Sequence, residues 1–338
     1  MRNLLTDIPG VLVGHATDLA LGSGVTAVIF EEAATASVST LGGAPGSRDT
    51  TMLEPEMTIE RVDAIVLSGG SCFGLDAAGG VQAWLRGQGR GTPIGPMLIP
   101  IVPQAIIFDL LNGGNKDWGR FSPYREMGFA AAEAAVAGNF DLGTMGGGTG
   151  ATTPLVKGGL GSASMVTEEG HRVAALVVVN AVGNPLVGEG PHFWAAPFER
   201  DGEFGDLGLP PAPFPAEALR PRFKGHPDPT SMALPETGTT IGLVVTDAPL
   251  TKAQAKRLAI AGQDGLARAV HSAHLTFDGD TMFGASTGKG EAIGPAALAL
   301  ICHAAGMVMA RAIARGVFEA TALPYPDALP DWRTRFSR

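Results

Sequence analysis

The chain has 338 residues, of which 45% are hydrophobic and 17% charged, and its formal net charge is −9. This length and composition are typical of a well-buried globular protein with one large α/β domain or two average domains, and they exclude a disordered chain. The sequence carries no basic patch interleaved with aromatic residues, so nucleic acid is not expected as a partner.

The sequence predicts a cytoplasmic protein without a membrane span. The two cysteines, Cys72 and Cys302, exclude a disulfide framework and fit a reducing compartment. The first residues reach Asp7 and Pro9 before any apolar stretch develops, which is not the pattern of a signal peptide. The most membrane-like segment, 293–312, is interrupted by polar residues and is predicted to be a buried helix.

Up to residue 235 the predicted elements alternate between strands and glycine-rich turns. Residues 62–89 read as an apolar strand, a glycine-serine turn and a helix that ends near glycine. A glycine-rich passage and strand-like alternation follow in 143–165, and a valine-rich strand within 172–188 stops at Asn180. Residues 210–235 hold eight of the 25 prolines, which predicts an exposed connector without a helix or an interior strand.

After the connector the pattern becomes regular. A strand over 239–247 leads to a helix over 251–270, a strand and loop over 274–287, and the apolar helix. Strands interleaved with helices in this way predict sheet layers covered by helices, within a single domain that spans 1–338.

Several short motifs suggest chemistry but lack its context. The glycines of 143–150 are not followed by the helix and acid of a dinucleotide site, and 284–292 departs from a P-loop. Ser71 lacks the second glycine of a nucleophile elbow, so we interpret it as a helix cap. His271 and His274 with Asp278 form no closed ligand set, so neither a metal nor another cofactor is expected.

The junction between Gly238 and Thr239 is the strongest candidate for chemistry. A threonine hydroxyl is a poor nucleophile unless a base lies beside it, and an N-terminal threonine carries that base as its own α-amine. The unperturbed pKa of an α-amine, about 8, suits a general base. Thr239 would attack the Gly238 carbonyl, and glycine at 238 would tolerate the strained backbone that this attack needs. An ordinary turn with Thr239 and Thr240 opening a strand is the other interpretation.

Longer blocks of the sequence resemble one family in order along nearly the whole chain. They are "PGVLVGHATD", "GGAPGSRDT", "VDAIVLSGGSCFGLDAAGGV", "IVPQAIIFDL", "GGGTGATTPLVKGGLGSAS", "VVVNAVG", "GTTIGLVVTDAPLTKAQAKRLA" and "FDGDTMFGAST". The family is the DmpA-like group of self-processing peptidases and amidases, which includes L-aminopeptidase/D-esterase, β-peptidyl aminopeptidases and the nylon-oligomer hydrolase.

The resemblance implies a precursor that cuts itself into 1–238 and 239–338. The two pieces are expected to stay together in an αββα sandwich similar to that of N-terminal-nucleophile hydrolases. The resemblance also implies a homo-oligomer, a tetramer of cleaved protomers, that acts on small peptides or other amides.

The resemblance further assigns roles to single residues. Thr239 matches the nucleophile, and Asn180 matches the residue whose side-chain amide faces the oxyanion. Asp278 and Asp280 match the acidic pair that the nylon-oligomer hydrolase has near its nucleophile. Two carboxylates would raise the pKa of the α-amine and oppose its role as a base. One aspartate is therefore expected either to orient the Thr239 hydroxyl or amine or to be offset by a cation, for which Lys157 is the candidate.

The chain departs from the family in the expected substrate pocket. Phe108 stands where many members have a tyrosine that supports the oxyanion, so the second donor is expected to be a backbone N–H or water. Ile106 stands where β-peptidyl aminopeptidases have a glutamate that holds the substrate's free amine. An apolar residue cannot pair with an ammonium, which favours hydrolysis of longer or less polar amides, with Asp109 as a partial substitute.

Two other functions remain open from the sequence. Ornithine acetyltransferase also cleaves itself before a threonine, although its Lys-Gly-Ser-Gly-Met run is absent ahead of this junction. An uncleaved member that keeps the fold for binding is the second alternative.

Overall fold

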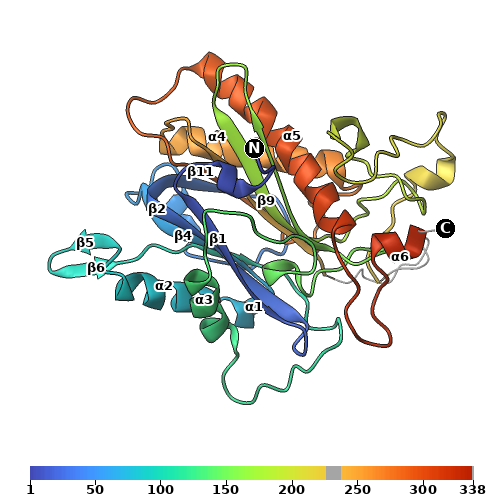
Figure 1. The fold of residues 1–338 in the computed structure, drawn as a ribbon, viewed down its shortest axis with the longest axis horizontal. Helices are drawn as coiled ribbons and strands as arrows, with labels where there is room; N and C mark the ends of the chain where they lie inside the picture. Colours follow the sequence, from blue (N-terminus) through green and yellow to red (C-terminus); the bar gives the residue numbers. More distant parts are fainter. Residues whose placement is uncertain (226–236, 337–338) are drawn as a thin grey trace.

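The computed structural model describes residues 1–225 and 237–336, and within them nine strands form one mixed sheet with helices on both sides (Figure 1). The strands of this sheet are β1 Val11–Asp18, β2 Ser23–Thr40, β3 Ser47–Arg48, β4 Arg61–Ser68, β7 Gln104–Ile106, β8 Gly159–Val166, β9 Arg172–Asn180, β10 Thr239–Thr246 and β11 Thr281–Ser286. A separate hairpin consists of β5 Thr92–Ile94 and β6 Met97–Ile99.

The helices are distributed along the whole described chain. The α-helices are α1 Ser71–Gly74, α2 Ala77–Gly87, α3 Tyr124–Glu133, α4 Lys252–Ala269, α5 Pro295–Phe318 and α6 Trp332–Phe336. The 3-10 turns are η1 Leu5–Asp7, η2 Thr51–Leu53, η3 Gly146–Gly148, η4 Ala196–Phe198 and η5 Ala216–Leu219.

The long strand β2 joins the two halves of the sheet. The strand order is β3-β7-β4-β2-β11-β10-β9-β8, and β1 also pairs with β2. Most of β4 pairs with the first half of β2, whereas β11 pairs with its last residues, 35–40. Between Ile29 and Ala34 the register with β4 shifts, and an irregularity of this kind bends a strand.

Alternate residues of the strands face two different cores, which defines the layers. In β9 the odd-numbered residues 173–179 pack under α4 and α5, whereas Ala174, Leu176 and Val178 face the inner residues of β2, β4 and β11. A third core lies between β2, β4 and the helices α2 and α3. The predicted αββα arrangement is therefore confirmed, and its two β layers are continuous through β2.

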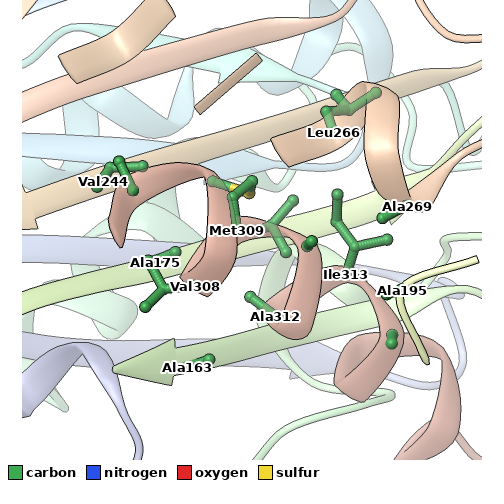
Figure 2. Close-up of a cluster of buried hydrophobic side chains, with 14 of the residues drawn as sticks. Ala163, Ala175, Ala195, Val244, Leu266, Ala269, Val308, Met309, Ala312 and Ile313 are labelled. Carbon is green, nitrogen blue, oxygen red and sulfur yellow. The ribbon is translucent and has the colours of Figure 1, made fainter. Parts of the chain in front are cut away.

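Helix α5 supplies much of the outer core over β8 and β9. Figure 2 shows Val308 and Ala312 of this helix close to Ala175 and Ala163 of the strands beneath, whereas Ile313 lies toward Ala269 of α4. Among the described helices, α5 is the one long and apolar enough by composition to cross a membrane, and 56% of its most apolar window is buried. This packing against the sheet confirms the prediction of a buried helix.

Two local predictions need correction. Ser71 does not cap a helix with its hydroxyl, because Gly70 takes the N-cap position of α1 with a φ of 85° and Ser71 is the first helical residue. In the connector, η5 forms between prolines, and Lys224 is buried although most neighbouring residues are exposed. The rest of the predicted connector, 226–236, lies outside the described residues.

Candidate active site

Thr239 is the first residue of β10 and lies beside the end of β9. In the antiparallel pairing of these strands it is directly opposite Asn180. Its side chain is buried, and its hydroxyl donates a hydrogen bond to the carbonyl oxygen of Gly238 at 2.5 Å. The hydroxyl therefore contacts the carbonyl group of the peptide bond that precedes its own residue.

Gly238 is held by the backbone of the neighbouring residues Asp278 and Gly279. Its carbonyl oxygen also accepts the N–H of Gly279 at 3.1 Å, and residue 238 forms a parallel bridge with Asp278. Glycine was expected at 238 because the backbone would be strained there, and this reason is wrong, because the φ of Gly238 is not in the positive region. Glycine is required here because a Cβ would lie 2.5 Å from the nitrogen of Val182.

Asp280 lies in the loop before β11 and accepts hydrogen bonds from two directions. Its Oδ1 accepts the N–H of Thr240 at 2.8 Å. Its Oδ2 accepts the backbone N–H of His274 at 3.0 Å, and it lies 2.9 Å from the His274 Nδ1. This carboxylate therefore fixes the backbone that follows Thr239 and pairs with His274.

Asp278 is the second acidic residue of this loop, and its proton is held unusually tightly. Burial, and to a lesser degree the nearby charge of Asp280, raise the pKa of Asp278 to about 7. The backbone N–H groups of Leu275 and Val182, at 2.8 and 3.3 Å, oppose this shift. A carboxyl group that titrates near neutral pH is suited to accept or donate a proton during a reaction.

The side-chain amide of Asn180 is fully buried and oriented by three groups. Its Oδ1 accepts the backbone N–H of Thr152 at 2.9 Å and the ammonium of Lys224 at 2.7 Å. Its Nδ2 donates to the carbonyl oxygen of Phe108 at 3.0 Å. Sequence reasoning missed Lys224, because the proline-rich pattern around it predicted only an exposed connector.

A cavity of about 840 Å³ opens beside this cluster. Residues from distant parts of the chain line it, among them Phe108, Asp109, Thr152, Leu155, Lys157, Arg222, Lys224, Thr237, Leu323 and Tyr325. Ile106, predicted to be part of the substrate pocket, is not among its lining residues; its side chain is buried and faces Gly46.

Lys157 and Asp109 are buried ionisable residues in the lining of the cavity. The Lys157 ammonium donates to the carbonyl oxygens of Gly148 and Gly158 at 3.0 and 2.8 Å. Burial lowers the pKa of Lys157 to about 7, although Asp109 opposes the shift. Burial likewise raises the pKa of Asp109, which accepts hydrogen bonds from Ser23 and Gly70. The carboxylate whose charge acts on Lys157 is therefore that of Asp109.

In the described residues no ion pair joins the predicted cation, Lys157, to the acidic pair. Asp280 instead lies 2.9 Å from the Nδ1 of His274, a ring that is positive only when protonated. Lys224 contacts Asn180, the residue opposite Thr239. The three residues considered as metal ligands also separate, because His271 lies against Trp194 whereas His274 binds Asp280. Within residues 1–225 and 237–336, no group of three potential ligands could hold a metal ion.

The chain matches known proteins over most of its length. The model of Peptidase family S58 matches residues 3–328. An uncharacterized aminopeptidase of Mycobacterium leprae is 40% identical over 315 residues, which cover 86% of this chain and 80% of the relative. A 6-aminohexanoate-oligomer endohydrolase of a Kocuria species is 27% identical over 294 residues, 85% of this chain and 75% of that enzyme.

Two solved structures share the fold at lower sequence identity. A Burkholderia β-aminopeptidase has a TM-score of 0.70 and 22% identity, with 98% of this chain and 91% of that chain covered. The L-aminopeptidase D-Ala-esterase/amidase of Ochrobactrum anthropi, described as a variant of the Ntn-hydrolase fold, has a TM-score of 0.70 and 20% identity over 96% and 88% of the two chains. From the family match and the close relatives, we conclude that the chain belongs to peptidase family S58 and is a hydrolase of amide or peptide bonds.

Proposed function

We propose that the chain is a self-processing hydrolase whose nucleophile is Thr239. In this proposal Thr239 attacks the carbonyl carbon of Gly238 and divides the chain into 1–238 and 239–338. The observation that carries the proposal is the 2.5 Å hydrogen bond from the Thr239 hydroxyl to the Gly238 oxygen. The same oxygen accepts the N–H of Gly279, which stabilises negative charge that develops there during attack.

The self-cleavage step balances with water as the co-reactant. The Thr239 oxygen forms a bond to the Gly238 carbon, the peptide C–N bond breaks, and the hydroxyl proton passes to the leaving nitrogen. Water then hydrolyses the ester, which leaves a carboxylate on Gly238 and a free hydroxyl and amine on Thr239. Before cleavage the nitrogen of Thr239 is an amide and cannot act as a base. We assign the proton transfer to Asp278, because its backbone is bridged to Gly238 beside the bond that breaks.

In the cleaved enzyme the free α-amine of Thr239 becomes the base. It removes the hydroxyl proton as the oxygen attacks the carbonyl carbon of a substrate amide, and the proton passes to the leaving amine as the C–N bond breaks. Water then hydrolyses the acyl-enzyme, which releases the acid and restores the Thr239 hydroxyl. Asn180, opposite Thr239, has a second amide hydrogen beyond the one that Phe108 accepts, and we assign this hydrogen to the oxyanion.

The cavity supports amides with an apolar acyl chain as substrates. Phe108, Leu155 and Leu323 line it, and the lining residue Asp109 is buried and already hydrogen-bonded. A free substrate ammonium would therefore find Asp109 engaged, and of the exposed carboxylates in the lining, Glu189 and Asp327, the first is paired with Arg222. Hydrolysis rates of short aminoacyl-anilides and of ω-amino-acid oligomers compare the two substrate types, and exclusive turnover of the anilides would contradict this preference.

Matched valine substitutions at two adjacent threonines test the nucleophile. Thr240 is buried on the opposite face of β10, and in the described part of the chain its hydroxyl has no hydrogen-bond partner. Intact-mass analysis should give two fragments for wild type and Thr240→Val, and one uncut, inactive chain for Thr239→Val. Cleavage of the Thr239→Val protein, or an active wild-type chain of full length, would contradict the proposal.

A further inference from the structure

Lys224 is a buried cation at the centre of the site. Its side chain is only 5% exposed, and its ammonium donates to the Oδ1 of Asn180 at 2.7 Å and to the Asn180 carbonyl oxygen at 3.3 Å. It comes from the segment that precedes the proposed cleavage site, whereas Asn180 ends β9. A buried ammonium is costly unless hydrogen bonds satisfy it, so these contacts hold both groups in place.

The chemistry of its neighbours dictates how the Asn180 amide is turned. The oxygen and nitrogen of an amide have similar shapes, and only their hydrogen-bond partners distinguish them. The Lys224 ammonium and the Thr152 N–H can only donate, so both must face Oδ1. The Phe108 carbonyl can only accept, and it lies at Nδ2. Lys224 therefore helps to exclude the flipped amide, in which an oxygen would face the oxyanion.

The segment around Lys224 is anchored independently of the Gly238–Thr239 bond. The backbone N–H of Lys224 donates to the carbonyl oxygen of Val182 at 2.9 Å, and Arg222 forms a 2.7 Å ion pair with Glu189. All of these partners lie in 1–238. After cleavage at residue 238, Lys224 and Asn180 would belong to the same piece, and their contact would be retained.

We infer that Lys224 is a positioning residue that holds the Asn180 amide with its N–H toward the carbonyl oxygen under attack. This inference rests on the proposed function, because it requires Asn180 to serve the reaction of Thr239. Lys224 acts through Asn180 and does not itself touch the reacting atoms. Its removal should therefore reduce kcat and leave KM nearly unchanged.

A double-mutant cycle tests the inference on the full-length protein. The variants are Lys224→Met, Asn180→Ala and the double substitution, with Lys224→Arg as the conservative variant. Lys256→Met is the control for loss of a lysine charge, since Lys256 pairs with Glu54 on the surface. Steady-state amide hydrolysis provides kcat and KM, and thermal unfolding shows whether each variant is folded. If a variant purifies uncut, the half-life of its self-cleavage replaces kcat in the cycle.

The expected results separate positioning from a structural role. Lys224→Met should lower kcat about tenfold or more, with KM within about threefold of the wild-type value. In the Asn180→Ala background, the same substitution should lower kcat by less than about a further twofold. Lys224→Arg should recover most of the activity. The inference would be overturned if Lys224→Met kept the wild-type kcat, or if the effects of the two substitutions multiplied in the folded double variant. It would also be overturned if Lys224→Arg were as impaired as Lys224→Met. Self-cleavage of Thr239→Val would instead overturn the proposed function, so the two failures are distinguishable.

Discussion

Thr239, the first residue of β10, lies directly opposite Asn180, the last residue of the antiparallel strand β9. Directly opposed residues of antiparallel strands have their Cβ atoms about 4.5–5.5 Å apart on the same face of the sheet. The proposed nucleophile and the proposed oxyanion donor are therefore set by strand register, and a shift of one residue would turn them to opposite faces.

Replacing Asn180 should impair catalysis more than folding. Asn180→Ala removes the amide donor, and loss of one oxyanion donor typically lowers kcat by about 10²–10³. Asn180→Asp keeps an oxygen for Thr152 and Lys224 but also removes the donor. Both variants should therefore show a similar loss in kcat, measured by steady-state hydrolysis. An Asn180→Asp enzyme with wild-type kcat would show that the donor is not needed.

Gly279→Ala should block self-cleavage. A Cβ at this position would lie 2.6 Å from the Thr239 Oγ1 and 3.0 Å from the Ala44 carbonyl oxygen. The hydroxyl would be displaced from the Gly238 carbonyl, so the half-life of the precursor on denaturing gels should lengthen at least tenfold. Gly294→Ala is the control, since a Cβ there has no atom within 4 Å among the described residues. Normal cleavage in folded Gly279→Ala would contradict the observed contact as the reactive arrangement.

Self-cleavage should become faster as pH rises through about 7. The reason is that Asp278, whose pKa is raised to about 7 by burial and by the charge of Asp280, accepts a proton only after it has ionised. Cleavage half-lives of freshly purified precursor between pH 5.5 and 8.5 measure this dependence. In Asp278→Asn cleavage should be slow at every pH. A wild-type rate that does not change across this range would exclude Asp278 as the base.

The same carboxyl group should make stability depend on pH. Because its pKa is higher in the folded protein than the ordinary 3.8, the folded state keeps a proton that the unfolded state loses between about pH 4 and 7. The free energy of unfolding should therefore fall as pH rises through this window. Urea unfolding of uncut Thr239→Val, compared with Thr239→Val/Asp278→Asn, isolates the contribution of Asp278. An unchanged difference between the two proteins from pH 4.5 to 7.5 would contradict it.

Glu203→Ala should destabilise the fold strongly. Glu203 pairs with Arg311 of α5 at 2.5 Å, and both side chains are buried. Arg311 also donates to Ser164 O and Asn3 Oδ1, so the pair ties α5 to β8 and the N-terminal segment. Removing one partner of a buried ion pair typically costs about 3–5 kcal/mol, because the other charge is left uncompensated. Denaturant unfolding measures this loss, and the exposed pair of Lys289 and Glu32 offers Glu32→Ala as a nearly neutral control.

Local sequence patterns determined the elements and the outline of the site. The valine-rich run predicts a strand that stops at Asn180, and β9 ends there. The periodicity of 251–270 predicts α4, which Thr251 caps by accepting the N–H of Gln254. These predictions succeed because strand and helix propensities, caps and turns depend on neighbouring residues, and the resemblance of ordered blocks adds the family that the comparisons confirm.

Which of these residues contact one another became clear only from the three-dimensional arrangement of the chain. Lys224 lies within a proline-rich stretch, and its contact with Asn180 could be found only in the structure. Gly238 looked necessary for a strained backbone, but it is necessary because Val182 lies too close for a side chain. The pKa of Asp278 likewise depends on burial and on neighbours brought together by β9, β10 and the loop before β11. Contacts and burial of this kind join residues far apart in the chain, so they cannot be inferred from neighbouring residues, which are enough to predict a strand or a helix.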